Sequence, residues 1–196
     1  VYGESHGKSI GAVLDGLPSG EYLDWDEVKK EMARRAPGKN TLSTSRKEGD
    51  AFDVQSGYFN NATTGTPLAV MIENTNTRSE DYDDLRHLMR PGHADYTGKV
   101  RYDGYNDYRG GGHFSGRLTA PLVFAGAVAS QILARRGIHV GSHILQIHDV
   151  QDRPFNPVHE ELSLLLSLKN LTLPLLDETR TEAMEEAVAA AKSRHD

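Results

Sequence analysis

The sequence contains no cysteine, and this absence removes several kinds of chemistry. Disulfide bonds, thiolate nucleophiles and zinc or iron–sulfur sites with cysteine ligands are excluded. A long hydrophobic run is also missing, because the longest, residues 120–129, is too short to span a bilayer, and no basic-then-apolar signal pattern opens the chain. We therefore expect a cytoplasmic protein without a membrane partner.

An excess of positive charge is missing as well. The 196 residues carry 22 Lys and Arg against 28 Asp and Glu, which gives a formal net charge of −6. Binding along a nucleic acid requires clustered Lys and Arg, so we expect no nucleic-acid partner. An anionic small molecule would have to bind in a local basic pocket. The hydrophobic fraction of 37% is enough for the core of one globular domain or of part of one.

Hydrophobic patterning predicts an α+β fold. Short apolar or alternating runs predict strands at residues 10–14, 52–58, 68–73 and 138–147. A helix is expected from Asp24, with a capping box to Glu27 and an end at Pro37-Gly38.

Two further helices are predicted later in the chain. Residues 118–136 are apolar nearly all round and end before Gly137, which indicates a buried central helix. Residues 179–196 form an amphipathic pattern in which Thr179 and Glu182 make a capping box, and Met184 lies on the apolar face. That apolar face requires a partner surface.

Three polar, glycine-rich segments each contain a histidine close to groups that bind anions. They are residues 3–7 (Gly-Glu-Ser-His-Gly), residues 90–95 (Arg-Pro-Gly-His-Ala-Asp) and residues 109–117 (Arg-Gly-Gly-Gly-His-Phe-Ser-Gly-Arg). The third segment directly precedes the predicted central helix. Because the N-terminus of a helix attracts anions through its unsatisfied N–H groups, we expect a phosphate or another anion there. The alternative is that these glycines only make a tight turn.

Other interpretations of these motifs fit the sequence less well. Residues 3–7 match the Gly-x-Ser-x-Gly nucleophile elbow of serine hydrolases, but an elbow lies between a strand and a helix, and here a strand follows. Residues 110–115 lack the third glycine of a dinucleotide-binding fingerprint. His139, His143 and His148 alternate faces along a strand, so we assign no metal.

Taken together, the motifs resemble one family. The segments Gly3-Glu4-Ser5-His6-Gly7, Asp15-Gly16-Leu17-Pro18, Arg34-Arg35-Ala36-Pro37-Gly38, Thr64-Gly65-Thr66-Pro67, Arg90-Pro91-Gly92-His93-Ala94-Asp95 and Tyr108-Arg109-Gly110-Gly111-Gly112 through Ser115-Gly116-Arg117 occur in the order and at the spacing of chorismate synthases. Each motif alone is weak, but several in register across about the first 120 positions are specific.

The resemblance implies a lyase of the shikimate pathway, at its last common step, which serves aromatic amino acid biosynthesis. The implied reaction is an anti-1,4-elimination of phosphate from 5-enolpyruvylshikimate 3-phosphate, which gives chorismate and requires reduced FMN. His6 would be the acid that protonates the departing phosphate, and His93 would protonate or hold the reduced flavin. Imidazole suits both roles because its unperturbed pKa of ~6.5 lies near neutrality.

The resemblance also implies the residues that bind the substrate and the cofactor. Ser5, Arg35, Arg46, Arg90, Ser115 and Arg117 would line the pocket for a substrate with a phosphate and two carboxylates. His113, Phe114 and Ser115 match the stretch that contacts FMN in the family, where many members have Arg-Ser-Ser. A second departure is Thr41, where many members carry Arg.

Finally, the resemblance implies a β-α-β sandwich of antiparallel sheets around internal helices, assembled as a homotetramer. Family chains are much longer, so we expect residues 1–196 to be the N-terminal part of one such domain, inactive without the C-terminal half. NADPH is a candidate reductant for the flavin. The non-enzymatic alternative is a fragment or paralogue that only binds anions, and the serine hydrolase is a further alternative.

Overall fold

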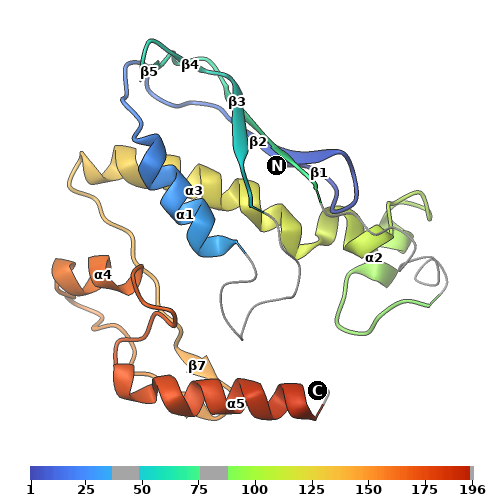
Figure 1. Ribbon diagram of the computed structural model, residues 1–196, viewed down its shortest axis with the longest axis vertical. Helices are drawn as coiled ribbons and strands as arrows, with labels where there is room; N and C mark the ends of the chain where they lie inside the picture. Colours follow the sequence, from blue (N-terminus) through green and yellow to red (C-terminus); the bar gives the residue numbers. More distant parts are fainter. Residues whose placement is uncertain (37–48, 76–87, 195–196) are drawn as a thin grey trace. The chain divides into compact units, whose positions relative to one another are not determined.

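The computed structural model describes residues 1–36, 49–75 and 88–194, which form two compact units, Val1–Ile132 and Leu133–Asp196 (Figure 1). Arg46 and Thr41 lie outside the described residues, as does the helix end expected at Pro37-Gly38. Every other residue assigned above to a site belongs to the first unit.

The first unit is built on an antiparallel sheet with the strand order β1-β2-β6-β3. Its strands are β1 (Tyr2–Gly3), β2 (Ser9–Leu14), β3 (Phe52–Ser56) and β6 (Leu68–Glu73). A separate hairpin joins β4 (Tyr58–Phe59) and β5 (Ala62–Thr63). The strands predicted at residues 10–14 and 68–73 are confirmed, and they pair with each other along their whole length.

The strand predicted over residues 52–58 is interrupted. Its pairing with β6 shifts register between Val54 and Ser56, and Gly57 then takes a φ of 82°. A Cβ at Gly57 would lie 2.5 Å from the Cα of Leu68. Because only glycine allows this backbone approach, the chain bends here and continues as β4.

Helix α1 (Trp25–Arg35) begins as the sequence predicts. The Asp24 carboxylate accepts hydrogen bonds from the backbone N–H groups of Asp26, at 2.9 Å, and Glu27, at 3.2 Å. The other half of the capping box is absent, because the Glu27 carboxylate accepts from Lys30 instead. Val28 and Met32 face the core, as expected.

Helix α3 (Thr119–Ala134) supplies the centre of the core, with Phe124 and Val128 fully buried. α3 and α1 lie on the same side of the sheet (Figure 1), and the Gln131 amide makes hydrogen bonds with both backbone groups of Asp24. The predicted central helix is confirmed, but it is buried on one face only, since Leu122 is 56% exposed on the opposite face.

One helical stretch of the described residues, Arg109–Ala134, is long and apolar enough to cross a membrane by length and composition alone. Of the 18-residue apolar window within it, 44% is buried inside the fold, and the core helix of a soluble protein gives the same signal.

The second unit contains the hairpin β7 (Gln146–Ile147) and β8 (Val150–Gln151), helix α4 (Leu162–Leu168), a short 3-10 turn η4 (Glu178–Arg180) and helix α5 (Thr181–Ser193). The strand predicted over residues 138–147 is wrong except at its last two residues. Ile138 and Val140 are exposed, and the Ile144 N–H donates to the Pro174 carbonyl in a loop rather than to a strand. A segment with an apolar pattern becomes a strand only where another strand offers hydrogen-bond partners for its backbone.

The predicted amphipathic helix is confirmed as α5, which contacts β7 and β8 and buries Met184. Its predicted cap is wrong. Asp177, rather than Thr179, caps the preceding turn, because the Asp177 carboxylate accepts from both the backbone N–H and the hydroxyl of Thr179. Aspartate competes well for this position.

Asp152 organises the second unit. Its buried carboxylate accepts from the backbone N–H groups of Leu176 at 2.7 Å, Asp177 at 2.9 Å and Arg153 at 2.8 Å, and contacts the His143 ring at 3.1 Å. Burial opposes ionisation, but these hydrogen bonds outweigh it and hold the pKa of Asp152 below its ordinary value of 3.8.

We expect Asp152→Asn to lower the free energy of unfolding of the second unit by about 1–3 kcal/mol, because a charge-assisted acceptor is lost. Because the pKa of Asp152 is lowered by folding, its contribution is present above pH 3.8 and is lost as the pH falls through the folded-state pKa. Hydrogen exchange at the amides of Leu176 and Asp177 would measure the change. Asp149→Asn, on the exposed turn of the same hairpin, is the control, and equal exchange in both variants would contradict the role of Asp152.

Candidate functional site

Two of the predicted motifs meet in the first unit. We call residues 3–7 the His6 turn and residues 109–115 the glycine loop. The Ser5 N–H donates to the Gly112 carbonyl at 3.1 Å, and the His113 Nδ1 lies 2.8 Å from the Gly3 carbonyl. Segments more than 100 positions apart in the sequence are therefore joined by one backbone–backbone hydrogen bond and by one contact from the His113 ring to the backbone.

The glycine loop requires glycine for two separate reasons. Gly110, Gly111 and Gly112 have φ angles of 58°, 83° and 55°, a region that other residues rarely adopt. In addition, a Cβ on Gly110 would lie 2.4 Å from Cε1 of His6 and 3.0 Å from the Ser5 hydroxyl. The backbone of Gly110 is thus the surface against which the buried His6 ring and Ser5 lie.

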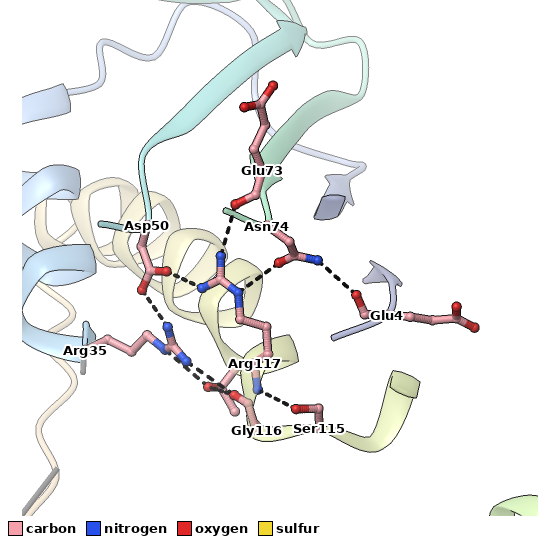
Figure 2. A network of polar contacts seen from close by, with 9 residues as sticks. Glu4, Arg35, Asp50, Glu73, Asn74, Ser115, Gly116 and Arg117 are labelled. Carbon is pink, nitrogen blue, oxygen red and sulfur yellow. Dashed lines mark hydrogen bonds and ion pairs between the residues drawn. The ribbon is translucent and has the colours of Figure 1, made fainter. Parts of the chain in front are cut away.

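A buried aspartate joins two of the predicted arginines. The Asp50 carboxylate is fully buried and accepts from Arg35 at 2.5 Å through one oxygen and from Arg117 through the other (Figure 2). Two guanidinium groups share one carboxylate, so the trio carries one net positive charge. Such a cluster is suited to a further anion.

Arg117 extends this network to the His6 turn. Its Nε donates to the Asn74 side-chain oxygen at 3.0 Å, and its Nη2 donates to the Glu73 carbonyl at 3.3 Å. The Asn74 amide in turn donates to the Glu4 carbonyl at 3.0 Å (Figure 2). It also donates to the Gly7 carbonyl at 2.9 Å. The Arg117 side chain is only 3% exposed, so it acts here as an internal link between β6, α3 and the His6 turn.

The start of α3 is partly satisfied by the protein itself. The Ser115 hydroxyl accepts from the Arg117 N–H at 3.3 Å, and the Ser115 carbonyl accepts from the Leu118 N–H at 3.0 Å. The short turn η3 (Gly116–Leu118) thereby separates the glycine loop from α3. Anion binding at this helix end stays a prediction.

The segment before helix α2 (Asp95–Arg101) carries Arg90 and His93. Arg90 makes a two-pronged ion pair with Asp95, with N–O distances of 2.9 and 3.0 Å, and its backbone N–H donates to the same carboxylate. The hydrogen bonds from Arg90 hold the pKa of Asp95 below its ordinary value. His93 is exposed, and its Nδ1 lies 3.2 Å from the Pro91 carbonyl.

Arg90 reaches the glycine loop from this segment. A Cβ on Gly111 would lie 3.7 Å from its Nη2 and 3.9 Å from the Cβ of Ser115. Phe114 packs against α2 instead, because a Cβ on Gly98 would lie 2.9 Å from its ring. The Phe114 ring is 46% exposed, and the Tyr102 ring lies 6.2 Å from it.

The structure thus brings together most of the predicted site residues around the glycine loop. Ser5 and His6 lie against Gly110, Arg90 and Ser115 lie beside Gly111, and Arg35 and Arg117 meet at Asp50. His93 joins this group only through Arg90, to whose carbonyl the His93 N–H donates at 3.4 Å, among the contacts of the described residues.

Sequence reasoning missed Asp50, Asn74 and Asp95, which hold the arginines in place. Asp50 lies just before one predicted strand, and Asn74 lies directly after another. These positions beside a strand were the available signal in the sequence. Asp95 was quoted within a motif, but nothing in the motif marks it as the partner of Arg90.

The hydrolase alternative does not fit this geometry. The His6 turn connects β1 to β2, which pair as antiparallel neighbours, so no helix follows Ser5. A nucleophile elbow requires a strand, then the serine, then a helix.

We expect Gly110→Ala to displace the His6 ring, whereas Gly111→Ala should not. Both substitutions place a side chain at a positive φ, which costs about 1 kcal/mol, but only the first places a methyl group within 2.5 Å of the imidazole. NMR shifts of the His6 ring would report the difference. Equal ring shifts in the two variants would show that Gly110 does not position His6.

We expect Asp50→Ala to lower the free energy of unfolding by about 3–5 kcal/mol, because it leaves Arg117 buried without its main charge partner. Asp53→Ala, on the exposed side of β3, is the matched control and should change stability by less than about 0.5 kcal/mol. Urea unfolding of both variants would measure this. A loss in Asp50→Ala no larger than in the control would contradict the proposed role of the carboxylate.

Known proteins resemble this chain over its whole length. The sequence matches the family described as chorismate synthase over residues 1–196. Chorismate synthase of Sulfurimonas denitrificans is 42% identical over 196 residues, which are 100% of this chain and 52% of the relative. That of Thermococcus kodakarensis is 44% identical, over 100% of this chain and 53% of the relative. The chain therefore spans about half the length of the curated relatives it matches.

A solved structure agrees with the fold. A crystal structure of chorismate synthase is 27% identical in sequence, with a TM-score of 0.68, and the match covers 98% of this chain and 52% of that one. The predicted α+β class, with antiparallel sheets and internal helices, is confirmed. Since the family match runs the whole length of the sequence, this chain belongs to the chorismate synthase family.

Proposed function

We propose that the protein containing this chain catalyses the anti-1,4-elimination of phosphate from 5-enolpyruvylshikimate 3-phosphate, which yields chorismate. The carbon–oxygen bond at C3 breaks, a proton leaves C6, and a new double bond forms. The observation that carries this proposal is the packing of His6 and Ser5 on Gly110, beside the arginines that a phosphorylated dicarboxylate requires.

His6 is the acid in this proposal. Its ring is 8% exposed and is held against the backbone of Gly110, so its position is fixed before a substrate binds. A fixed acid can protonate the phosphate as the carbon–oxygen bond breaks, and imidazole can release that proton again near neutral pH. Ser5, immediately before it, is fully buried against Gly110, and we assign it to the substrate pocket on the family resemblance.

The arginines provide the anion site. Arg35 is 18% exposed and Arg90 is 32% exposed, so both guanidinium groups reach the surface of the site while an aspartate fixes each of them. Arg117 is buried, and we assign it to holding Arg35 and Asp50 in place as much as to the substrate. Arg46 is proposed as a further substrate residue on the resemblance alone.

The described residues fit a flavin. The half-exposed Phe114 ring, with Tyr102 beside it, offers an apolar surface to a flat ring system, and His113 and Ser115 flank it on the same loop. The chemistry that reduced FMN supplies when bound is electron density for cleavage of the carbon–oxygen bond, without net redox change. His93, exposed before α2, would hold or protonate the flavin. NADPH as reductant, a homotetramer and a cytoplasmic location are proposed on the family resemblance.

The test is an anaerobic assay of the protein encoded by the whole gene, with photoreduced FMN and 5-enolpyruvylshikimate 3-phosphate. We expect chorismate and phosphate to appear together, and expect His6→Ala and His93→Ala each to lower kcat by about 10²–10⁴-fold, the range of general acid catalysis. His139→Ala, an exposed histidine of the second unit, is the control and should keep full activity.

A folded wild-type protein that binds FMN but releases no phosphate would reject the lyase. It would favour the anion-binding paralogue instead.

A further inference from the structure

The side chain of Asn74 closes the turn that carries His6. Within this turn, the Gly7 N–H donates to the Glu4 carbonyl at 3.0 Å, which is the hydrogen bond of a four-residue β-turn. The Asn74 side-chain nitrogen donates to the carbonyls at both ends, to Glu4 at 3.0 Å and to Gly7 at 2.9 Å. Ser5 and His6 are the two residues between those ends. One amide group therefore holds the backbone on both sides of them.

The backbone of Asn74 is fixed by the sheet. Asn74 directly follows β6, and its N–H donates at 3.1 Å to the carbonyl of Lys8, the residue before β2. This hydrogen bond continues the antiparallel pairing of β2 with β6 one step beyond Ser9 and Glu73. The side chain that reaches the turn thus projects from a backbone that the strands hold in place.

The neighbours of the Asn74 amide set its orientation. Its oxygen accepts from the Arg117 Nε at 3.0 Å, and Figure 2 shows the amide between the Arg117 guanidinium and the Glu4 backbone. A guanidinium only donates and a carbonyl only accepts, so the oxygen faces Arg117 and the nitrogen faces the turn. An ionised aspartate has nearly the same shape but no donor for the carbonyls, and alanine has neither group. Both kinds of contact together require an amide.

We propose that Asn74 is a positioning residue for the proton donor: its amide holds the turn that carries His6 in register with the Arg117–Asp50 cluster. This rests on the proposed function, in which His6 is the acid and the arginines provide the anion site. Protonation of a departing phosphate is efficient only where the acid and the anion site keep a fixed distance and angle. Asn74 contacts both, because its nitrogen bonds the turn and its oxygen bonds Arg117.

Two other contacts of the turn lead in a different direction. The Ser5 N–H and the Gly3 carbonyl join it to the glycine loop. They set where His6 meets that loop, but neither of them involves Arg117. Loss of the Asn74 amide should therefore release the turn from the arginine cluster while the turn stays attached to the loop.

The first experiment needs no substrate and uses the protein encoded by the whole gene, at neutral pH, where an exposed aspartate is ionised. We expect Asn74→Ala and Asn74→Asp each to shift the NMR resonances of the His6 ring and of the Gly7 amide, because neither side chain donates to the turn. Asn60→Asp, on the exposed turn between β4 and β5, makes the same chemical change and should leave these resonances unchanged.

The second experiment compares kcat and KM in the anaerobic assay. We expect Asn74→Ala to lower kcat about 10–100-fold, because a misplaced acid slows the chemical step. Its KM should stay within about 2-fold, since Arg117 keeps Asp50 as its partner. Asn74→Asp should lower kcat by a similar factor although its carboxylate still accepts from Arg117, and its KM should rise because the added charge repels an anionic substrate. Asn60→Asp should keep both constants.

Rescue by aspartate would overturn the proposal. If Asn74→Asp restored the kcat that Asn74→Ala loses, the amide would matter only as an acceptor for Arg117. Wild-type kcat in Asn74→Ala, or an unshifted His6 ring in both variants, would overturn it equally. Failure of both variants to fold would do the same, because it would assign the amide to the fold as a whole. If one variant alone fails to fold, the other decides.

Failure of the proposed function would look different. If the wild-type protein has no lyase activity, the assignment of His6 as the acid fails. The resonances of the His6 ring then still decide whether Asn74 holds the turn.

Discussion

The buried carboxylate of Asp50 is the constraint on which the site depends. It lies before β3, accepts from the last residue of α1 and from the turn before α3, and is shielded completely from water. A lone charge at such depth would be strongly unfavourable, so the carboxylate and its two arginines must be kept together. Keeping them together fixes the ends of three elements that are distant in sequence. The geometry of this arginine cluster follows from the electrostatic requirement.

The site combines rigid supports with close backbone contact. The sheet and the aromatic contacts of Trp25 with Tyr58 and Phe124 hold α1 and α3 in place. The polar groups then project from the ends of these elements, where glycines let one backbone approach another. The chain has a net charge of −6 and still gathers guanidinium groups at one place. This is favourable because each aspartate beside them orients an arginine and offsets positive charge.

The sequence predicted local features well where local chemistry decides them. The Asp24 cap, the apolar runs of β2 and β6 and the amphipathic face of α5 all depend on residues close together in the chain. The strand predicted over residues 138–147 shows the limit of prediction from local pattern. Most of this segment has no neighbouring strand with which to pair, so its apolar pattern does not produce a strand.

The partners of the arginines mark the same limit within the site. The motifs identified Arg35, Arg90 and Arg117, but a sequence does not state which acid a basic residue will meet. Asp50 lies 67 positions from Arg117, and only tertiary packing brings them together. The position of an acid or an amide at a strand end is a clue to such a role, but many strands end that way.

The three glycines of the loop differ in how much space they leave for a side chain. A Cβ on Gly111 would meet Arg90 at 3.7 Å and Ser115 at 3.9 Å, which are ordinary contact distances, so an asparagine, which tolerates the backbone angle, has room for its Cβ there. Gly110 and Gly112 have atoms of the protein at 2.4 and 2.0 Å from any added Cβ. Among these three glycines, only the middle one therefore leaves room for a side chain, and a variant with a side chain at position 110 would have to carry a differently placed histidine.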